Sequence, residues 1–177
     1  MYFLENSKSS TSADIKNKTA IDDMGHIFLE HKLPVSGYLV AWQYYVNIDG
    51  GRFRVCTNTS YAAIIRRNGN KYTMIAKTLL APEDFTNAGV RFQFIQNEVI
   101  RVQKDDLIAA FTHRGFLSEC NQLISVHPTS GSNTLTIAIS AESYDVNKTY
   151  TFPSGYYDLA DPALKAYVSG IDQLLAR

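Results

Sequence analysis

In the segment GYLVAWQYYVNI (residues 37–48), apolar or aromatic residues alternate with smaller and more mixed ones, as in a half-buried β-strand. Successive side chains of an extended chain point to opposite faces, and one face here is entirely apolar or aromatic: Tyr38, Val40, Trp42, Tyr44, Val46 and Ile48. The other face is smaller and more mixed, as on the less buried side of an antiparallel sheet, and it consists of Leu39, Ala41, Gln43, Tyr45 and Asn47. We therefore expect a central strand whose core is centred on Trp42.

Short strand-like runs and turn signals extend outward from this segment. Asp49-Gly50-Gly51 predicts a hairpin directly after it, and Asn68-Gly69-Asn70 predicts a second hairpin between strands at 61–67 and 71–79. Further runs of strand character occupy 52–57, 90–95, 98–103, 107–112, 122–127, 134–140 and 148–152. This spacing predicts an all-β fold, an antiparallel β-sandwich of jelly-roll-like form.

The two ends of the chain differ from the middle. Residues 5–19 are rich in Ser, Thr, Lys and Asn, which predicts a flexible N-terminal arm over 1–20 and one sandwich domain over 21–177. Within the arm, Tyr2-Phe3-Leu4 could pair with a sheet edge or with another subunit. At the other end, Asp161-Pro162 followed by apolar residues at helical spacing predicts a short C-terminal helix. A final strand over 164–168 is the alternative.

Size and charge exclude several classes of protein. With 177 residues, of which 45% are hydrophobic, the chain is suited to one substantial core. Seventeen basic residues balance seventeen acidic ones, so no overall field favours nucleic acid as a partner. No window reaches the ~18 apolar residues of a membrane span, so we expect no membrane insertion. The opening residues lack a signal-peptide pattern, so secretion would require that a leader has been removed.

Two features favour an extracellular setting. Cys56 and Cys120 are the only cysteines, and they form either one disulfide or two free thiols; a disulfide would favour secretion. Three Asn-X-Ser/Thr sequons, at Asn17, Asn58 and Asn147, are candidate glycosylation sites.

The sequence contains no motif of a known catalytic site. No nucleophile elbow, phosphate loop or zinc-binding histidine pattern is present, so we expect no catalytic residues and no enzyme activity, with a hydrolase as the least favoured alternative. Asp105-Asp106 could begin a calcium site, because hard cations take carboxylate oxygens; solvated turns explain the same pair.

A basic and aromatic group is the candidate ligand site. Arginines can fork onto planar oxyanions, and tyrosines can stack on a sugar or anchor a protein partner. The candidates are Arg66, Arg67, Lys71, Tyr72 and Tyr45. A solvated hairpin tip and sheet packing are the alternative explanation.

Three runs resemble extracellular β-sandwich modules of secreted invertebrate adhesion, matrix and recognition proteins. They are GYLVAW with Tyr44-Tyr45, then IIRRNGNKY (64–72), then IRVQKDDLIA (100–109), and together they cover about 37–112. Asp105 stands where such modules usually have Gly. The resemblance implies a secreted, non-catalytic recognition domain that binds a glycan or a protein through loops at one end of the sandwich. The alternative is a structural, self-assembling subunit that forms homo-oligomers.

Overall fold

A computed structural model describes the chain over 4–5, 19–20, 24–46, 54–55, 60–81, 89–112, 120–121, 125–127, 133–138, 144–152, 156–159, 161–162 and 164–170. In these residues the regular structure is entirely β. The strands are β1 (Leu4–Glu5), β2 (Thr19–Ala20), β3 (Met24–Lys32), β4 (Gly37–Val46), β5 (Arg54–Val55), β6 (Ser60–Asn68), β7 (Lys71–Leu79), β8 (Gly89–Phe94), β9 (Ile100–Val102), β10 (Leu107–Thr112), β11 (Cys120–Asn121), β12 (Ser125–His127), β13 (Asn133–Ala138), β14 (Thr149–Tyr150), β15 (Tyr156–Leu159), β16 (Asp161–Pro162) and β17 (Leu164–Gly170).

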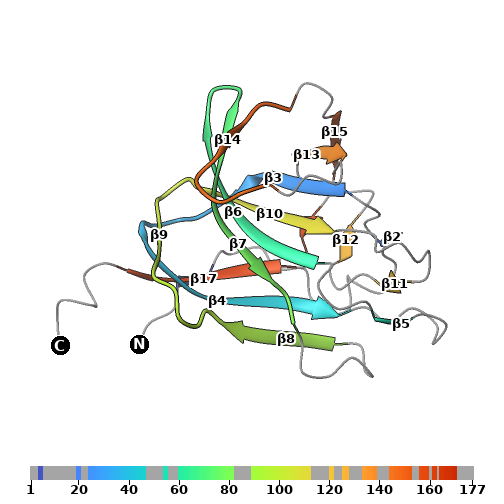
Figure 1. Cartoon of the computed structure of the whole chain (residues 1–177), viewed down its shortest axis with the longest axis horizontal. Coiled ribbons are helices and arrows are strands. Elements are labelled where there is room, and N and C mark those ends of the chain that lie inside the picture. The colour runs from blue at the N-terminus through green and yellow to red at the C-terminus, as the bar shows by residue number, and fades with distance from the viewer. Residues whose placement is uncertain are drawn as a thin grey trace.

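Most of these strands belong to two antiparallel sheets. The smaller sheet has the order β1-β17-β4-β8, with β9 pairing the start of β4, and the larger has the order β14-β7-β6-β10-β3-β13-β15. In Figure 1 β17, β4 and β8 run side by side below β3 and β10. The chain crosses repeatedly between the sheets, for example from β3 to β4 and from β9 to β10. The predicted all-β class and sandwich architecture are therefore confirmed.

The main core fills the space between the two sheets. Trp42 and Phe28 are fully buried there, together with Ile64, Ile108 and Val168. The indole of Trp42 also donates from Nε1 to Thr78 Oγ1 at 3.1 Å, which links β4 to β7. The expectation that the core centres on Trp42 is confirmed.

The larger sheet is also covered on its other face. A second cluster includes Ile27, Ile65, Met74 and Phe111 from the sheet, and the 144–152 segment packs on it through aromatic rings: Tyr144, Tyr150 and Phe152. This segment is fixed to β7 by main-chain bonds from Met74 N to Lys148 O and from Asn147 N to Met74 O. The larger sheet is thus buried on both sides in its middle, whereas residues on the outer face of β8 are exposed.

A β-bulge changes the predicted faces of β4. The register with β17 runs from Tyr44–Leu164 to Ala41–Tyr167, then skips Val40 and resumes at Leu39–Val168. An extra residue reverses the side-chain alternation beyond it, so Leu39 is buried in the core while Tyr38 and Val40 are only partly buried. The predicted core face is right for Trp42 and Tyr44 and wrong for Tyr38 and Val40.

The predicted C-terminal helix is wrong over the described residues. Leu164–Gly170 forms β17, which lies between β1 and β4, and Leu164, Ala166 and Val168 point into the core. The alternative, a final strand over 164–168, is confirmed. Leu4 in the predicted arm pairs with Val168, so it meets a sheet edge. The described residues contain no helix with the length and apolarity needed to cross a membrane.

Candidate functional site

The open side of the sandwich, where β7 faces β8, contains a groove. It has a volume of about 650 Å³ and is lined by Tyr44, by Lys77–Leu79 and Ala81, and by Arg91–Gln96 with Glu98. A second groove of about 740 Å³ continues past the shared residues Lys77 and Glu98. It is lined mainly by Arg66, Ile75, Val99, Arg101, Gln103 and Asn147. The two grooves adjoin at Lys77 and Glu98, beside β7 and the segment from β8 to β9, and we call them together the β7–β8/β9 groove.

Gln93 holds the two walls of this groove together. Its side-chain amide donates to Leu79 O at 2.9 Å, and its Oε1 accepts from Ala81 N at 3.1 Å and from the Tyr44 hydroxyl at 3.4 Å. The contacts with Leu79 and Ala81 cross from the smaller sheet to β7 and its extension, whereas Tyr44 lies on β4, next to β8 in the same sheet. Burial raises the pKa of Tyr44 to about 12, and the nearby positive charge of Arg91 opposes this rise. Gln93 and Tyr44 therefore form a neutral, hydrogen-bonded base to the groove at ordinary pH.

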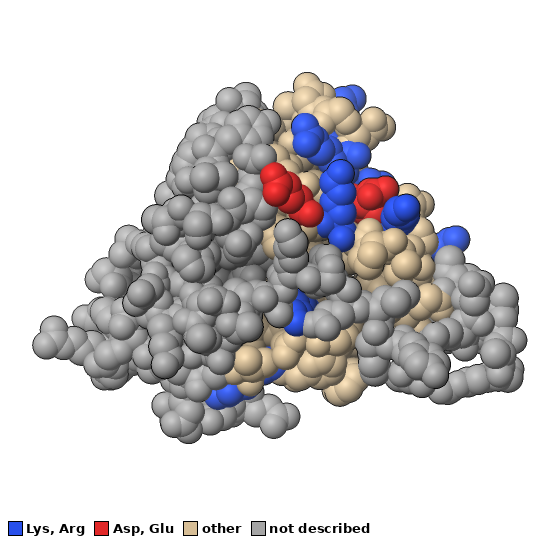
Figure 2. Space-filling model, turned by 180° about the vertical axis from the view of Figure 1, so that it is seen from behind, with Lys and Arg blue, Asp and Glu red and all other residues tan. Residues whose placement is uncertain are grey.

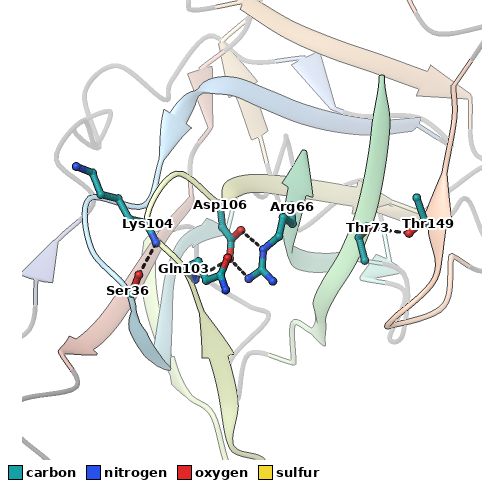
Figure 3. A network of polar contacts seen from close by, with 7 residues as sticks. All are labelled: Ser36, Arg66, Thr73, Gln103, Lys104, Asp106 and Thr149. Carbon is teal, nitrogen blue, oxygen red and sulfur yellow. Dashed lines mark hydrogen bonds and ion pairs between the residues drawn. The ribbon is translucent and has the colours of Figure 1, made fainter. Parts of the chain in front are cut away.

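An ion pair lies at the other end of the groove (Figure 3). Arg66 donates from Nε and from its terminal nitrogen to the two carboxylate oxygens of Asp106, both at 2.8 Å. Asp106 is only 2% exposed and also accepts from Gln103 N. Its hydrogen bonds raise the pKa of the Arg66 guanidinium. The pair fixes the turn before β10 against β6. Most of the hydrogen-bond accepting capacity of the Asp106 carboxylate is used for this purpose.

Exposed polar side chains form the β8–β9 wall of the groove. Gln96, Glu98, Arg101 and Gln103 are all exposed. Lys77 contributes less positive charge to the groove, because its ammonium is directed to the second cluster. It donates there to Tyr144 O and lies 5.2 Å from the ring centre of Tyr61. The wall thus combines amides with charges of both signs. Seen from behind the view of Figure 1, the molecule also shows basic side chains grouped around two patches of acidic ones (Figure 2).

The outer face of β8 has a different character. Val90, Phe92 and Phe94 are 48, 44 and 57% exposed. Phe92 packs edge-to-face against Phe94 and against Tyr167 of β17, with ring centres 4.9 and 5.1 Å apart. Tyr167 in turn donates to Gln43 Oε1. Single exposed apolar side chains are ordinary, but a contiguous patch is a feature of contact surfaces.

The structure separates most of the ligand residues expected from sequence. Arg66 pairs with Asp106, while Arg67 donates to Gly69 O and lies 5.7 Å from the ring centre of Tyr72. The Tyr72 ring is 4% exposed and packs against Phe152, so it is a core residue and not a surface one. Lys71 is exposed at the hairpin tip. Tyr45 lies on β4 opposite Val90, and its side chain is outside the described part.

The two candidate calcium residues, Asp105 and Asp106, lie in different environments. Asp105 is exposed with φ near 69°, in the left-handed region that favours glycine, whereas Asp106 is buried against Arg66. A cation at Asp106 would have to displace the guanidinium. In the described part of the chain no three His, Cys, Asp or Glu side chains gather as metal ligands would.

The remaining candidates are described only in part. Cys56, Asn17 and Asn58 lie outside the described residues, and Cys120 is placed by its main chain alone, opposite Arg54 in a parallel pairing. Asn147 is exposed in the turn before β14, with φ near 66°. The disulfide and the glycosylation sites therefore stay predictions.

Sequence reasoning named Arg66 as a ligand residue and Asn147 as a glycosylation site, but it missed the groove residues of β8 and β9 and the outer face of β8. The alternation in GVRFQF (89–94) could have indicated them, because it places Val90, Phe92 and Phe94 on one face and Arg91 and Gln93 on the other. The contact of β8 with the far end of β7 could not have been predicted from the sequence, because no local pattern in either segment indicates it. Comparison with protein families, with curated proteins and with solved structures finds no match to this chain.

Proposed function

We propose that the chain is a non-catalytic recognition domain of an extracellular protein, and that it binds a carbohydrate in the β7–β8/β9 groove. The supporting observation is the chemistry of the groove wall, where Gln96, Gln103, Glu98 and Arg101 are exposed beside apolar groups. Sugar hydroxyls both donate and accept hydrogen bonds, so a wall with amides, a carboxylate and a guanidinium suits them. The groove volumes of about 650 and 740 Å³ lie in the range of small-ligand sites.

The proposal assigns the groove, and not the hairpin tip, as the binding surface. Arg66 and Tyr72, two of the residues expected from sequence, are engaged in packing and in an ion pair. The exposed wall residues have no such role in the described structure. The extracellular setting is supported by the sequon at the exposed Asn147 and by the cysteine pair of the sequence.

A glycan array with the whole labelled chain tests the proposal, followed by calorimetric titration of the best ligand. Glu98→Ala and Arg101→Ala should each weaken binding by about tenfold, the loss of roughly one charged hydrogen bond. Arg67→Ala and Lys71→Ala at the hairpin tip are the matched controls and should leave the affinity unchanged. Because Asn147 lines the groove, binding should be measured before and after enzymatic removal of any attached glycan.

Two results would overturn the proposal. A chain that binds no glycan on the array would remove carbohydrate as the ligand class. Loss of binding in the hairpin-tip variants, with Glu98→Ala and Arg101→Ala unaffected, would move the site away from the groove.

A further inference from the structure

β8 ends the smaller sheet in the described part of the chain, and its outer edge is suited to accept another strand. Ile95 N donates to Val40 O, which defines the hydrogen-bonded pairs between β4 and the β8 segment. Because these pairs alternate along an antiparallel ladder, Arg91 and Gln93 bond toward β4, while the main-chain groups of Val90, Phe92 and Phe94 point away from it. Val90 O, which faces this outer edge, accepts a hydrogen bond from Nη1 of Arg91 at 3.1 Å, and a strand that pairs here would replace this contact.

The same three residues have exposed apolar side chains. Val90, Phe92 and Phe94 are each between 44 and 57% exposed on the outer face. Soluble sheet proteins usually protect an edge strand with charges, Pro or a bulge. The one charged side chain of β8, Arg91, lines the groove and reaches the edge only at Val90 O, so the main-chain groups of Phe92 and Phe94 have no charged side chain of β8 beside them in the described structure.

We infer that β8 pairs antiparallel with β8 of a second copy of this chain, about a two-fold axis at Phe92. In this register the outward main-chain groups of Phe92 meet those of Phe92 in the second copy, and those of Val90 meet those of Phe94. Every exposed apolar side chain of β8 then lies opposite another one. The inference uses the main-chain edge of β8 and not the exposed polar wall of the groove, although Phe92 and Phe94 also border the groove; Glu98→Ala and Arg101→Ala, which test carbohydrate binding, should therefore leave the dimer unchanged.

Charge selects this register over its neighbours. An axis at Phe92 places Arg91 opposite Gln93 of the second copy, whereas an axis at Arg91 would place two guanidinium groups opposite each other. An axis at Gln93 would set Val90 opposite Gln96, beyond the end of β8. Of these three registers, the one with the two-fold axis at Phe92 is therefore the most favourable for pairing between two copies.

The geometry of the rings favours a strand over a sugar on this surface. Phe92 is inclined by 75° to Phe94 and by 69° to Tyr167, so the three rings form no flat platform for a sugar face. The patch consists of three exposed side chains of β8, few beside the roughly 20 to 30 residues per side of a standard interface. We therefore expect a weak, reversible dimer, in which the second copy extends the smaller sheet.

Cysteine cross-linking of the whole chain tests the pairing. Residues facing each other in a hydrogen-bonded antiparallel pair have Cα atoms about 5.5 Å apart, within the range of a disulfide. Phe92→Cys should form a covalent dimer under mild oxidation. Val99→Cys is the matched control, since Val99 is 86% exposed but lies outside β8, and the unmodified chain reports the background from Cys56 and Cys120.

Sedimentation equilibrium over a wide concentration range provides the second measurement. The unmodified chain should show a monomer–dimer equilibrium, and Phe92→Lys should weaken it by about tenfold or more, because two lysines would face each other. Phe94→Lys repeats the test where the Phe92 variant perturbs folding, with the buried Trp42 emission as the check. A chain that stays monomeric, or a Val99→Cys chain that cross-links as fast as Phe92→Cys, would overturn the inference. Capture of a different protein by β8 with no self-association would do so as well.

Discussion

At Gly37 the neighbouring strand leaves no room for a side chain. A Cβ at this position would come within 2.0 Å of Ser169 O in the neighbouring strand β17, a main-chain atom that cannot move without breaking the pairing. We predict that Gly37→Ala lowers the free energy of unfolding by about 2 to 3 kcal/mol or more. Its cross-strand partner provides the control: a Cβ at Gly170 meets nothing within 4 Å, so Gly170→Ala should change stability by no more than about 0.5 kcal/mol. Urea unfolding of both variants measures the difference.

Tyr44 makes the stability sensitive to alkaline pH. Its pKa is raised from 10.0 to about 12 by burial, so the unfolded chain loses this proton at a lower pH than the folded chain. The contribution of the protonated Tyr44 hydroxyl to the free energy of unfolding is therefore complete below pH 10. It is lost as the pH rises toward 12, and the total loss is about 2 to 3 kcal/mol. Comparison of unfolding curves at pH 9 and pH 11.5 should show a smaller loss in Tyr44→Phe than in the unmodified chain. An equal loss in both would show that other groups are responsible.

At the scale of the element, the turn before β10 depends on one ion pair. Asp106 is buried and is bound by both arms of Arg66, while Leu33 N donates to Asp106 O and Asp105 N donates to Leu33 O. Arg66→Ala would leave a buried carboxylate with few partners, and because Arg66 is itself 35% exposed we expect a moderate cost of about 1 to 3 kcal/mol. Arg101→Ala removes an exposed arginine from the neighbouring β9 and should cost less than about 0.5 kcal/mol.

Local patterns predict elements well where a turn fixes their ends. The Asn68-Gly69 turn, with Gly69 at φ near 62°, separates β6 from β7, and the predicted strand at 71–79 coincides with β7. In β17 the residues Leu164, Tyr167 and Val168 fit a helical spacing, and Leu164, Ala166 and Val168 fit a strand. Pairing with β4 and β1 decides between them, and neither partner is local in sequence.

The candidate site was less predictable for the same reason. Arg66 and Asp106 are 40 positions apart, and only the pairing of β6 with β10 brings them together. Gln93 bonds to Leu79 and Ala81 across the sandwich. Composition and spacing contain no information about such contacts, whereas the alternation within β8 was readable and would have identified its exposed face.

At the scale of the whole molecule, Trp42 connects the two sheets through packing and through its bond to Thr78. Trp42→Ala should lower the free energy of unfolding by about 3 to 5 kcal/mol, the range for emptying a buried aromatic site. Thr78→Val removes the hydrogen bond and keeps the shape, so it should cost only about 1 kcal/mol. Thermal unfolding followed by circular dichroism compares the two. A loss below 1 kcal/mol for Trp42→Ala would contradict the central role of the indole.

The position of β17 between β1 and β4 has a consequence for synthesis of the chain. Leu4 pairs with Val168, and Trp42 lies opposite Ala166. During translation β1 and β4 leave the ribosome long before this partner does, so the smaller sheet can close only after residue 170 has been made. Until then the core side of β4, with Trp42, lacks the cover of Leu164, Ala166 and Val168, so we expect chaperones that bind nascent apolar segments to recognise this strand.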